Sequence, residues 1–403
     1  MASWSRRELI GRLALIGGLL ALLVVVVRLS LAPVFATAQP AFALKLASGH
    51  AQARATEAKV LLERLQWTAD RPRIEALVTD AIARDPTNVV AIAGAGLARD
   101  LAGRPDRAAR LFAYSDALSR RDLPTQLWLI ENAVAKGDPG SALRHYDIAL
   151  RTSRSAASLL FPILVDAVAS PSIIQPLAHT LATQPPWGPQ FVQQLAQSGR
   201  DLGAAAALYR AMRALKVEVP EQTIATLTGR MVEMRDYQAA WRLYADFHPA
   251  ARPDGLRNGD LRQQVGFPSP FDWTLSEEPS LGALLIADKG GGVLAFDASV
   301  DAGGVAARQL LMLPAGRHAL RGRAYDTAQA GVRRPLFRVR CVDGIGTEAL
   351  GQVELPSADV DGAGFQLAFA VPASCRAQWL ELVIVPSEGA VNVSGTVGEL
   401  SLR

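Results

Sequence analysis

Cysteine, histidine and net charge are all scarce in this sequence. Its 403 residues include two cysteines and five histidines, and 42 basic against 38 acidic side chains leave a formal net charge of +4. So small a basic excess argues against a nucleic-acid partner. Hydrophobic residues make up 50% of the chain, which excludes a disordered or collagen-like protein. The length and apolar content predict two or three domains, each with its own core.

The residues that catalysis usually needs are not grouped in a familiar pattern. The sequence has no HExxH, GxSxG or CxxC motif and no Cys/His cluster with metal-ligand spacing. The histidines are scattered along the chain, at His50, His145, His179, His248 and His318. We therefore expect no enzyme, no metal and no cofactor. Carboxylates that meet in space within the C-terminal region are the remaining route to catalysis.

A long apolar segment follows a basic N-terminus. Three arginines in residues 6–12 precede an uncharged run at residues 13–27. Residues 9–32 can span a bilayer if Arg12 and Arg28 extend their guanidinium groups to the two interfaces. The positive flank places the N-terminus in the cytoplasm and the rest of the chain outside it. This pattern predicts a single-pass protein of a bacterial inner membrane with its bulk in the periplasm.

The alternative interpretation of residues 1–38 is a cleaved signal peptide. Ala36-Thr37-Ala38 has the small-residue pattern of a cleavage site before Gln39. The length of the apolar region and the late position of this site favour the retained anchor. Both interpretations export the remainder of the chain to the periplasm.

The two cysteines, Cys341 and Cys375, lie in the C-terminal part of the chain. Two cysteines in an oxidising compartment most simply form one disulfide, and two buried free thiols are the alternative. Closure of a loop of this length contributes roughly 3–4 kcal/mol through the entropy of the unfolded chain.

Residues 39–253 are rich in Ala, Leu and Arg with helical periodicity, and they contain an internal repeat. Residues 103–108 align with residues 137–142 at an offset of 34, and Phe112 then aligns with Tyr146. Further on, small and aromatic positions recur at an offset of 35. The pattern predicts stacked helix pairs.

This pattern resembles the tetratricopeptide repeat (TPR), in which small residues lie where two helices cross and an aromatic fills the gap between neighbouring pairs. The residues that match these packing roles are Gly96, Ala108, Phe112, Ala142, Tyr146, Ala205, Tyr209, Ala240 and Tyr244. The Trp and Tyr expected in the first helix are mostly absent, and the proline-rich residues 154–200 fit poorly. An unrelated all-helical solenoid or bundle is the alternative. The resemblance implies a TPR-like solenoid that binds a protein partner on its concave surface.

The composition changes near residue 254. Residues 254–268 are interpreted as a linker, and residues 269–403 alternate between short apolar runs and turns. Nine strands are predicted, at 283–287, 292–297, 306–313, 317–324, 336–342, 348–354, 364–371, 378–385 and 391–402. So many short strands predict an antiparallel β-sandwich, such as a jelly roll.

Two segments, residues 309–320 and 391–402, resemble a turn and the last strand of jelly-roll modules that often bind carbohydrate. The chain is also similar to exported repeat proteins of bacterial polysaccharide loci, in which a Trp and two cysteines recur, here as Trp273, Cys341 and Cys375. The resemblance implies glycan binding through exposed aromatics and polar side chains. The candidates are Trp273, Tyr325, Asp326, Trp379 and Asn392, with Asp272 beside them. For each Trp the alternative role is packing in the core or at the domain junction.

The sequence therefore predicts a multidomain protein, an all-α TPR-like solenoid followed by an all-β sandwich. The favoured hypothesis is a non-catalytic envelope scaffold that supports assembly or export of cell-surface polysaccharide. In it the solenoid binds a protein, the sandwich binds polysaccharide and the N-terminal helix binds the membrane. A pure protein–protein adaptor is the alternative, and a glycan-modifying enzyme is a more distant one.

Overall fold

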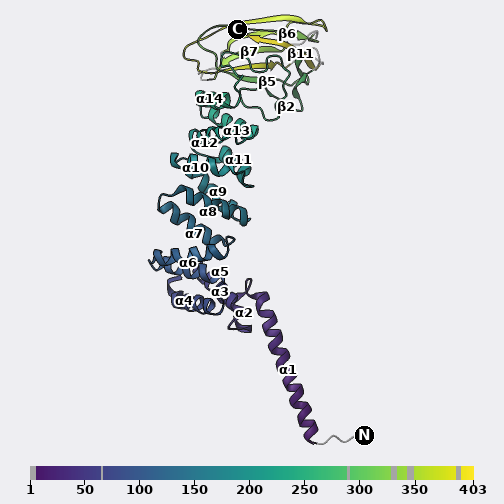
Figure 1. Ribbon diagram of the computed structural model, residues 1–403. Helices are drawn as coiled ribbons and strands as arrows, with labels where there is room; N and C mark the ends of the chain where they lie inside the picture. The colour runs from purple at the N-terminus through teal and green to yellow at the C-terminus, as the bar shows by residue number, and fades with distance from the viewer. Residues whose placement is uncertain (1–5, 65–66, 288–290, 328–333, 343–348, 387–391) are drawn as a thin grey trace, which may run out of the picture. The chain divides into compact units, whose positions relative to one another are not determined.

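The computed structural model describes residues 6–64, 67–287, 291–327, 334–342, 349–386 and 392–403 (Figure 1). In these ranges 14 helices precede 11 strands, and the strands form two antiparallel sheets. The fold class predicted from the sequence, a helical solenoid followed by a β-sandwich, is therefore confirmed. The chain divides into two units, residues 1–162 with 185–187, and residues 163–184 with 188–403.

The first unit begins with α1 (Arg6–Phe35), whose apolar part coincides with the segment predicted to be an anchor or a signal peptide. Residues 10–35 are long and apolar enough to cross a membrane, and their most apolar 18-residue window has a mean hydropathy of 2.6. Most of their side chains are exposed, as Leu19 is at 61% and Val34 at 66%. By length and composition this helix could therefore be a signal anchor or a transmembrane span.

The end of α1 is joined to the helices that follow it. Arg28 donates hydrogen bonds from Nη2 to the carbonyl of Lys45 (2.8 Å) and from Nε to that of Leu46 (3.1 Å) at the end of α2 (Pro40–Leu46). Ala32 and Ala36 are 0% and 1% exposed. Ala36 packs in a small cluster with side chains of α2 and α3 (Ala51–Leu62). The last turns of α1 are therefore part of the packed fold.

The remaining helices of the first unit form antiparallel pairs. They are α3 with α4 (Trp67–Arg84), α5 (Val89–Leu101) with α6 (Pro105–Leu118), and α7 (Leu123–Ala135) with α8 (Pro139–Thr152). Polar N-caps define where α5, α7 and α8 begin, because the side chains of Asn88, Asp122 and Asp138 each accept a bond from a backbone N–H three residues later. Helices α6, α7 and α8 also have proline in their first turn, where no backbone N–H is needed.

The small and aromatic repeat residues lie where helices meet. A Cβ on Gly96 would lie 2.9 Å from the ring of Phe112, so only glycine allows α5 and α6 to approach this closely. Phe112 is 1% exposed and stacks on Trp128 of the next pair, with ring centroids 4.5 Å apart. One aromatic thus joins two successive helix pairs.

Glycines 94 and 96 in α5 give a test of this packing. We expect Gly94→Ala to raise the free energy of unfolding by about 0.5–1 kcal/mol, because alanine favours the helix and its Cβ would meet Val78 at an ordinary 3.4 Å. We expect the free energy of unfolding of Gly96→Ala to be about 1–3 kcal/mol lower than that of Gly94→Ala, because the new Cβ overlaps the buried ring of Phe112. Denaturant unfolding of both variants measures the difference, and equal stabilities would contradict the close approach.

Residues 154–200, which fit the repeat pattern poorly, are largely helical. Pro162 lies inside α9 (Ala156–Ala167) and Pro176 inside α10 (Pro171–Ala182). The region also contains α11 (Gly188–Ser198), and α12 (Leu202–Ala214), α13 (Glu221–Glu233) and α14 (Tyr237–Phe247) follow it. Within the second unit, side chains bond to the backbone of neighbouring helices: Tyr209 donates to the carbonyl of Val192 (2.8 Å), and Arg230 donates to the carbonyls of Ala196 and Gly199.

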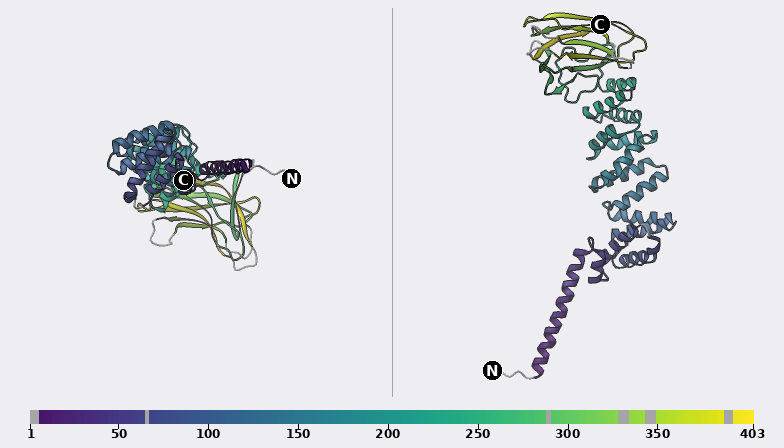
Figure 2. Two further views of the ribbon diagram at one scale, coloured as in Figure 1. Left: turned by 90° about the horizontal axis from the view of Figure 1, so that it is seen from below. Right: turned by 180° about the vertical axis from the view of Figure 1, so that it is seen from behind.

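The strands of the second unit form two sheets, which can be followed from two further sides in Figure 2. Sheet A has the order β1-β5-β10-β7-β8, and sheet B has the order β2-β3-β4-β11-β6-β9. The bounds are β1 (Thr274–Leu275), β2 (Glu277–Glu278), β3 (Leu281–Ala287), β4 (Gly292–Ala298), β5 (Gly304–Leu311), β6 (Gly316–Tyr325), β7 (Leu336–Cys341), β8 (Ala349–Glu354), β9 (Ala363–Val371), β10 (Gln378–Ile384) and β11 (Val393–Leu402). From β4 onward the chain changes sheet at almost every connection, as in jelly rolls.

All nine predicted strands are present, and two short ones, β1 and β2, were not predicted. Residues 348 and 391, the first residues of two predicted strands, lie outside the described residues. Alternate side chains point inward, such as Leu380 and Leu382 of β10 and Leu294 and Phe296 of β4, and they form one core between the sheets.

The segment interpreted as a linker contributes to this core. Leu261 is fully buried in it, and Leu256 packs against it. The backbone of this segment also pairs with the sandwich, because the amide of Gly292 donates to the carbonyl of Asp260 (3.1 Å). Residues 256–261 are therefore integral to the sandwich.

The predicted disulfide between Cys341 and Cys375 is present, with the two Cα atoms 5.6 Å apart. It links the end of β7 to the turn before β10, and these two strands are also paired in sheet A. The bond thus closes a 34-residue excursion that contains β8 and β9.

Candidate functional site

Tyr325, the last residue of β6, lies on the outer face of sheet B with its ring partly exposed. The ring rests on Gly362, whose φ of 72° and contact with the ring exclude a larger residue. Its hydroxyl donates to Oε1 of Glu399 at 3.0 Å, and the guanidinium of Arg323 lies 5.9 Å from the ring centroid. The ring is therefore held in place before any ligand arrives.

Two other candidates lie at the same end of sheet B. Asp326 follows Tyr325 directly and is exposed, with a positive φ of 53°. Asn392 is exposed just before β11, the antiparallel neighbour of β6. Thr396 of β11 lies directly opposite Tyr325 in the register and so faces the same side. Tyr325, Asp326 and Asn392 are thus at the same end of sheet B, and Glu399 is the acidic side chain in direct contact with the ring's hydroxyl.

The phenol of Tyr325 is protonated at neutral pH. Partial burial raises its pKa, and the hydrogen bond to Glu399 raises it further. The hydroxyl therefore acts as a donor to the carboxylate, which keeps its remaining lone pairs for other donors such as sugar hydroxyls.

The two tryptophans are placed elsewhere. Trp273 is 4% exposed within the sandwich core, and its Nε1 has no hydrogen-bond partner among the described residues. Trp379 lies on the outer face of sheet A, but it is only 9% exposed and the guanidinium of Arg308 lies 4.7 Å from its ring centroid. Neither ring has an exposed face on which a sugar could stack. Neither lies on the outer face of sheet B with Tyr325.

The first helices of three successive pairs, α3, α5 and α7, together with Phe112 of α6, line an apolar groove in the first unit. Its volume is about 260 Å³. Its apolar lining comes from Leu62, Val90, Ala93, Gly94, Leu97, Phe112, Pro124, Leu127 and Trp128, and its charged rim from Lys59, Glu63, Asp122 and Glu131. The sequence repeat predicted helix pairs but did not indicate which of their side chains line a groove.

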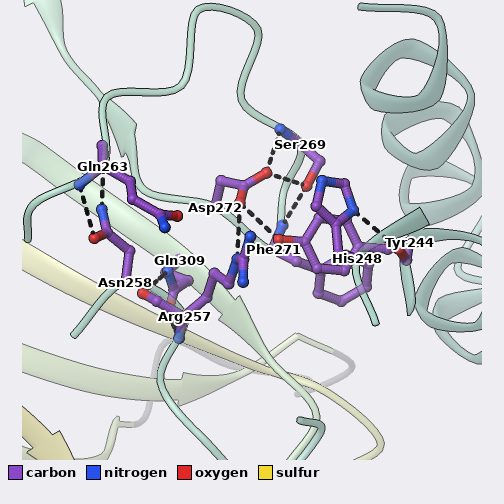
Figure 3. Close-up of polar contacts among 9 residues, drawn as sticks. All are labelled: Tyr244, His248, Arg257, Asn258, Gln263, Ser269, Phe271, Asp272 and Gln309. Atoms are coloured by element: carbon purple, nitrogen blue, oxygen red, sulfur yellow. Dashed lines mark hydrogen bonds and ion pairs between the residues drawn. The ribbon is translucent and has the colours of Figure 1, made fainter. Parts of the chain in front are cut away.

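A third cluster joins the last helix pair to the sandwich (Figure 3). Tyr244 of α14 is fully buried, and its hydroxyl donates to Oδ1 of Asp272 at 2.7 Å. The other oxygen, Oδ2, accepts bonds from the backbone N–H and hydroxyl of Ser269. Phe271 packs beside Tyr244, with ring centroids 5.2 Å apart, where another repeat would otherwise continue. The sandwich therefore caps the last helix pair of the second unit.

The polar groups of the residues in this cluster already have hydrogen-bond partners within it. Burial and the neighbouring Asp272 carboxylate raise the pKa of Tyr244 far above its usual range. Arg257 lies 3.7 Å from Asp272, and its backbone N–H and carbonyl bond to the side chain of Gln309 in β5. Asp272, a candidate for sugar hydroxyls, is 5% exposed and already holds the junction together.

No metal site is present in the part of the chain that the structure describes, since it contains no group of three or more His, Cys, Asp or Glu side chains placed to hold an ion. The buried histidine of the first unit, His145, instead bonds through Nδ1 to Gln126 Oε1 at 2.8 Å. Burial lowers its pKa, so it is neutral at physiological pH.

Comparisons with known proteins identify no family for this chain. No family model and no curated protein matches it. Among solved structures it is similar to the enzymatically active domain of tailspike protein 4 of bacteriophage CBA120, with 14% identity, a TM-score of 0.28, and coverage of 38% of this chain and 22% of the tailspike chain. A protein described as "CBM4 structure and function" has 12% identity and a TM-score of 0.26, covering 37% of this chain and 98% of the other.

A third similar structure is PilW, a type IV pilus biogenesis factor, with 16% identity and a TM-score of 0.23, covering 48% of this chain and 92% of PilW. The chain spans about a fifth of the tailspike protein. At these identities and TM-scores, no function is transferred from any of the three. The functional conclusion therefore rests on the side chains described above.

Proposed function

We propose that this protein is a non-catalytic scaffold of the bacterial envelope that supports assembly or export of cell-surface polysaccharide. In this proposal α1 anchors the chain in the inner membrane, the groove of the first unit binds a protein partner, and the outer face of sheet B binds glycan in the periplasm.

The observation that carries the proposal is the environment of Tyr325. Aromatic rings bind sugars through their faces, and a ring already fixed by Gly362 and Glu399 loses little conformational entropy on binding. The carboxylate of Glu399 is exposed and bonded to the ring's hydroxyl, and the carboxylate of Asp326 and the amide of Asn392 are exposed at the same end of the sheet, where all three suit sugar hydroxyls.

The packing at the end of α1 supports a retained anchor over a cleaved signal peptide. Cleavage after Ala38 would remove Arg28 and Ala36, which bond to and pack against α2 and α3.

The groove of the first unit supports a protein partner. A row of apolar side chains from three first helices, including Leu127 and Trp128, suits the apolar face of a peptide or helix. A pure protein–protein adaptor is the second candidate function, and it is favoured if sheet B binds no glycan.

Affinity electrophoresis of the detergent-solubilised full chain, through gels that contain the host's own surface polysaccharide, tests the glycan site. We expect the polysaccharide to retard the wild-type protein and Tyr325→Ala to lose most of this retardation, since it removes the ring and the donor to Glu399. Tyr114→Ala, at a 45% exposed tyrosine of the first unit, is the matched control and should migrate as the wild type does. Unretarded migration of the wild type on every host polysaccharide would contradict glycan binding.

A further inference from the structure

The outer face of sheet A carries a buried carboxylate between two arginines. Glu381 of β10 is 1% exposed, although its side chain points away from the core. Arg338 of β7 donates from Nε (3.0 Å) and Nη2 (2.7 Å) to one oxygen, Oε2. Arg340 lies with Nε 3.0 Å and Nη2 2.9 Å from the other oxygen, Oε1. Each guanidinium thus presents one edge to the same carboxylate.

This cluster has more positive charge than is required to neutralise Glu381. One arginine is enough to neutralise Glu381, and two are present. A third, Arg308 of β5, lies opposite Glu381 in the register, is exposed, and makes no ion pair with any described residue. Three positive charges and one negative charge therefore share this small part of the sheet.

The donors that remain point to an oxyanion ligand. A guanidinium has five N–H groups, and Arg338 and Arg340 use only Nε and Nη2 on Glu381. Their side chains are 30% and 34% exposed, so their other edges reach solvent. Because Glu381 already orders both side chains, a carboxylate or phosphate that binds them pays little rotamer entropy.

We propose that the cluster of Arg308, Arg338, Arg340 and Glu381 is a second glycan site, specific for the carboxylate groups of acidic sugars. The inference rests on the proposed function in taking polysaccharide as the ligand, but it concerns the sheet opposite Tyr325. The exposed amide side chain of Gln352 lies opposite Arg338 in the register and adds a partner for a sugar hydroxyl. The period-two alternation of Arg338-Val339-Arg340 was the signal in the sequence that indicates this outward pair.

The experiment is a titration of the detergent-solubilised full chain with polygalacturonate and with the same polymer after reduction of its carboxyl groups. We expect the wild type to bind the acidic polymer, more weakly as salt is raised, and not the reduced one. Arg340→Gln removes one guanidinium group while Arg338 still pairs with Glu381. We expect this variant to raise the Kd about tenfold or more. Arg340→Lys keeps the positive charge but lacks the paired N–H donors of a guanidinium, so it should restore only part of the affinity.

Controls separate this site from that of Tyr325 and from other anions. Arg321→Gln, at an exposed arginine of sheet B that bonds to Gln366, should leave the Kd unchanged. Tyr325→Ala should also bind polygalacturonate as the wild type does, so loss of host glycan binding and loss of acidic-polymer binding are distinguishable. Galacturonate oligomers should displace the polymer better than inorganic phosphate at equal ionic strength.

Three results would overturn the proposal. They are an unchanged Kd in both Arg340→Gln and Arg308→Gln, equal binding of the carboxyl-reduced polymer, and displacement by phosphate as effective as by galacturonate oligomers. Arg308 contacts the ring of Trp379 and pairs with no carboxylate among the described residues, so Arg308→Gln tests the site without disturbing Glu381.

Discussion

Replacing Tyr244 by alanine is expected to lower the free energy of unfolding of the second unit by about 3–5 kcal/mol. The side chain is fully buried and contacts rings on both sides of the junction: His248 at 4.1 Å and Phe271 at 5.2 Å between centroids. Its removal leaves a cavity, and it also takes the hydroxyl donor from the buried carboxylate of Asp272.

Tyr244→Phe separates these two effects. It keeps the ring and removes only the hydrogen bond to Asp272, and we expect a loss of about 1.5–3 kcal/mol because the acceptor is charged and buried. Denaturant unfolding measures the two losses in free energy. Native-state hydrogen exchange shows whether α13, α14 and the strands lose protection together. Full protection in α14 of the Tyr244→Ala protein would contradict the interpretation of the sandwich as a cap.

Removing the disulfide should have the second largest effect on the free energy of unfolding. The Cys341→Ser, Cys375→Ser double variant is expected to be about 3–4 kcal/mol less stable, because the unfolded chain regains the freedom of a 34-residue loop. The loss should be confined to the sandwich, where β7, β8 and β10 lie next to each other in sheet A.

The same measurement has an internal control. Treating the wild type with a reductant under native conditions should reproduce the loss of stability, whereas the double variant should be insensitive to the reductant. Hydrogen exchange should accelerate in β7 and β10 and stay unchanged in α5 and α7 of the first unit. A double variant as stable as the wild type would show that the bond constrains nothing in the unfolded chain.

The repeat architecture was readable from the sequence because its signals are local. Gly96 and Phe112 are only 16 positions apart, and the offset of 34 that aligns Phe112 with Tyr146 identifies the helix pairs. The strands were equally readable, since period-two alternation with turns at short intervals is a local property.

The positions of functional side chains depend on long-range contacts and were only partly predictable. Trp273 and Trp379 look alike as candidates in the sequence, and only the packing of the two sheets shows that one is in the core and the other beneath Arg308. Residues 256–261 have the polar composition of a linker, yet the fully buried Leu261 belongs to the sandwich core. Likewise, the approach of Arg338 and Glu381 follows from the pairing of strands 43 residues apart in the chain.

The central claim, that the protein supports cell-surface polysaccharide through the sheet B surface at Tyr325, is tested most directly in the organism that makes it. The measurement is the amount of surface polysaccharide in cells that lack the protein and in cells supplied with wild type, Tyr325→Ala or Tyr114→Ala at matched protein levels. We predict that polysaccharide falls without the protein and that wild type and Tyr114→Ala restore it, while Tyr325→Ala does not. Full restoration by Tyr325→Ala, or unchanged polysaccharide in cells without the protein, would contradict the account.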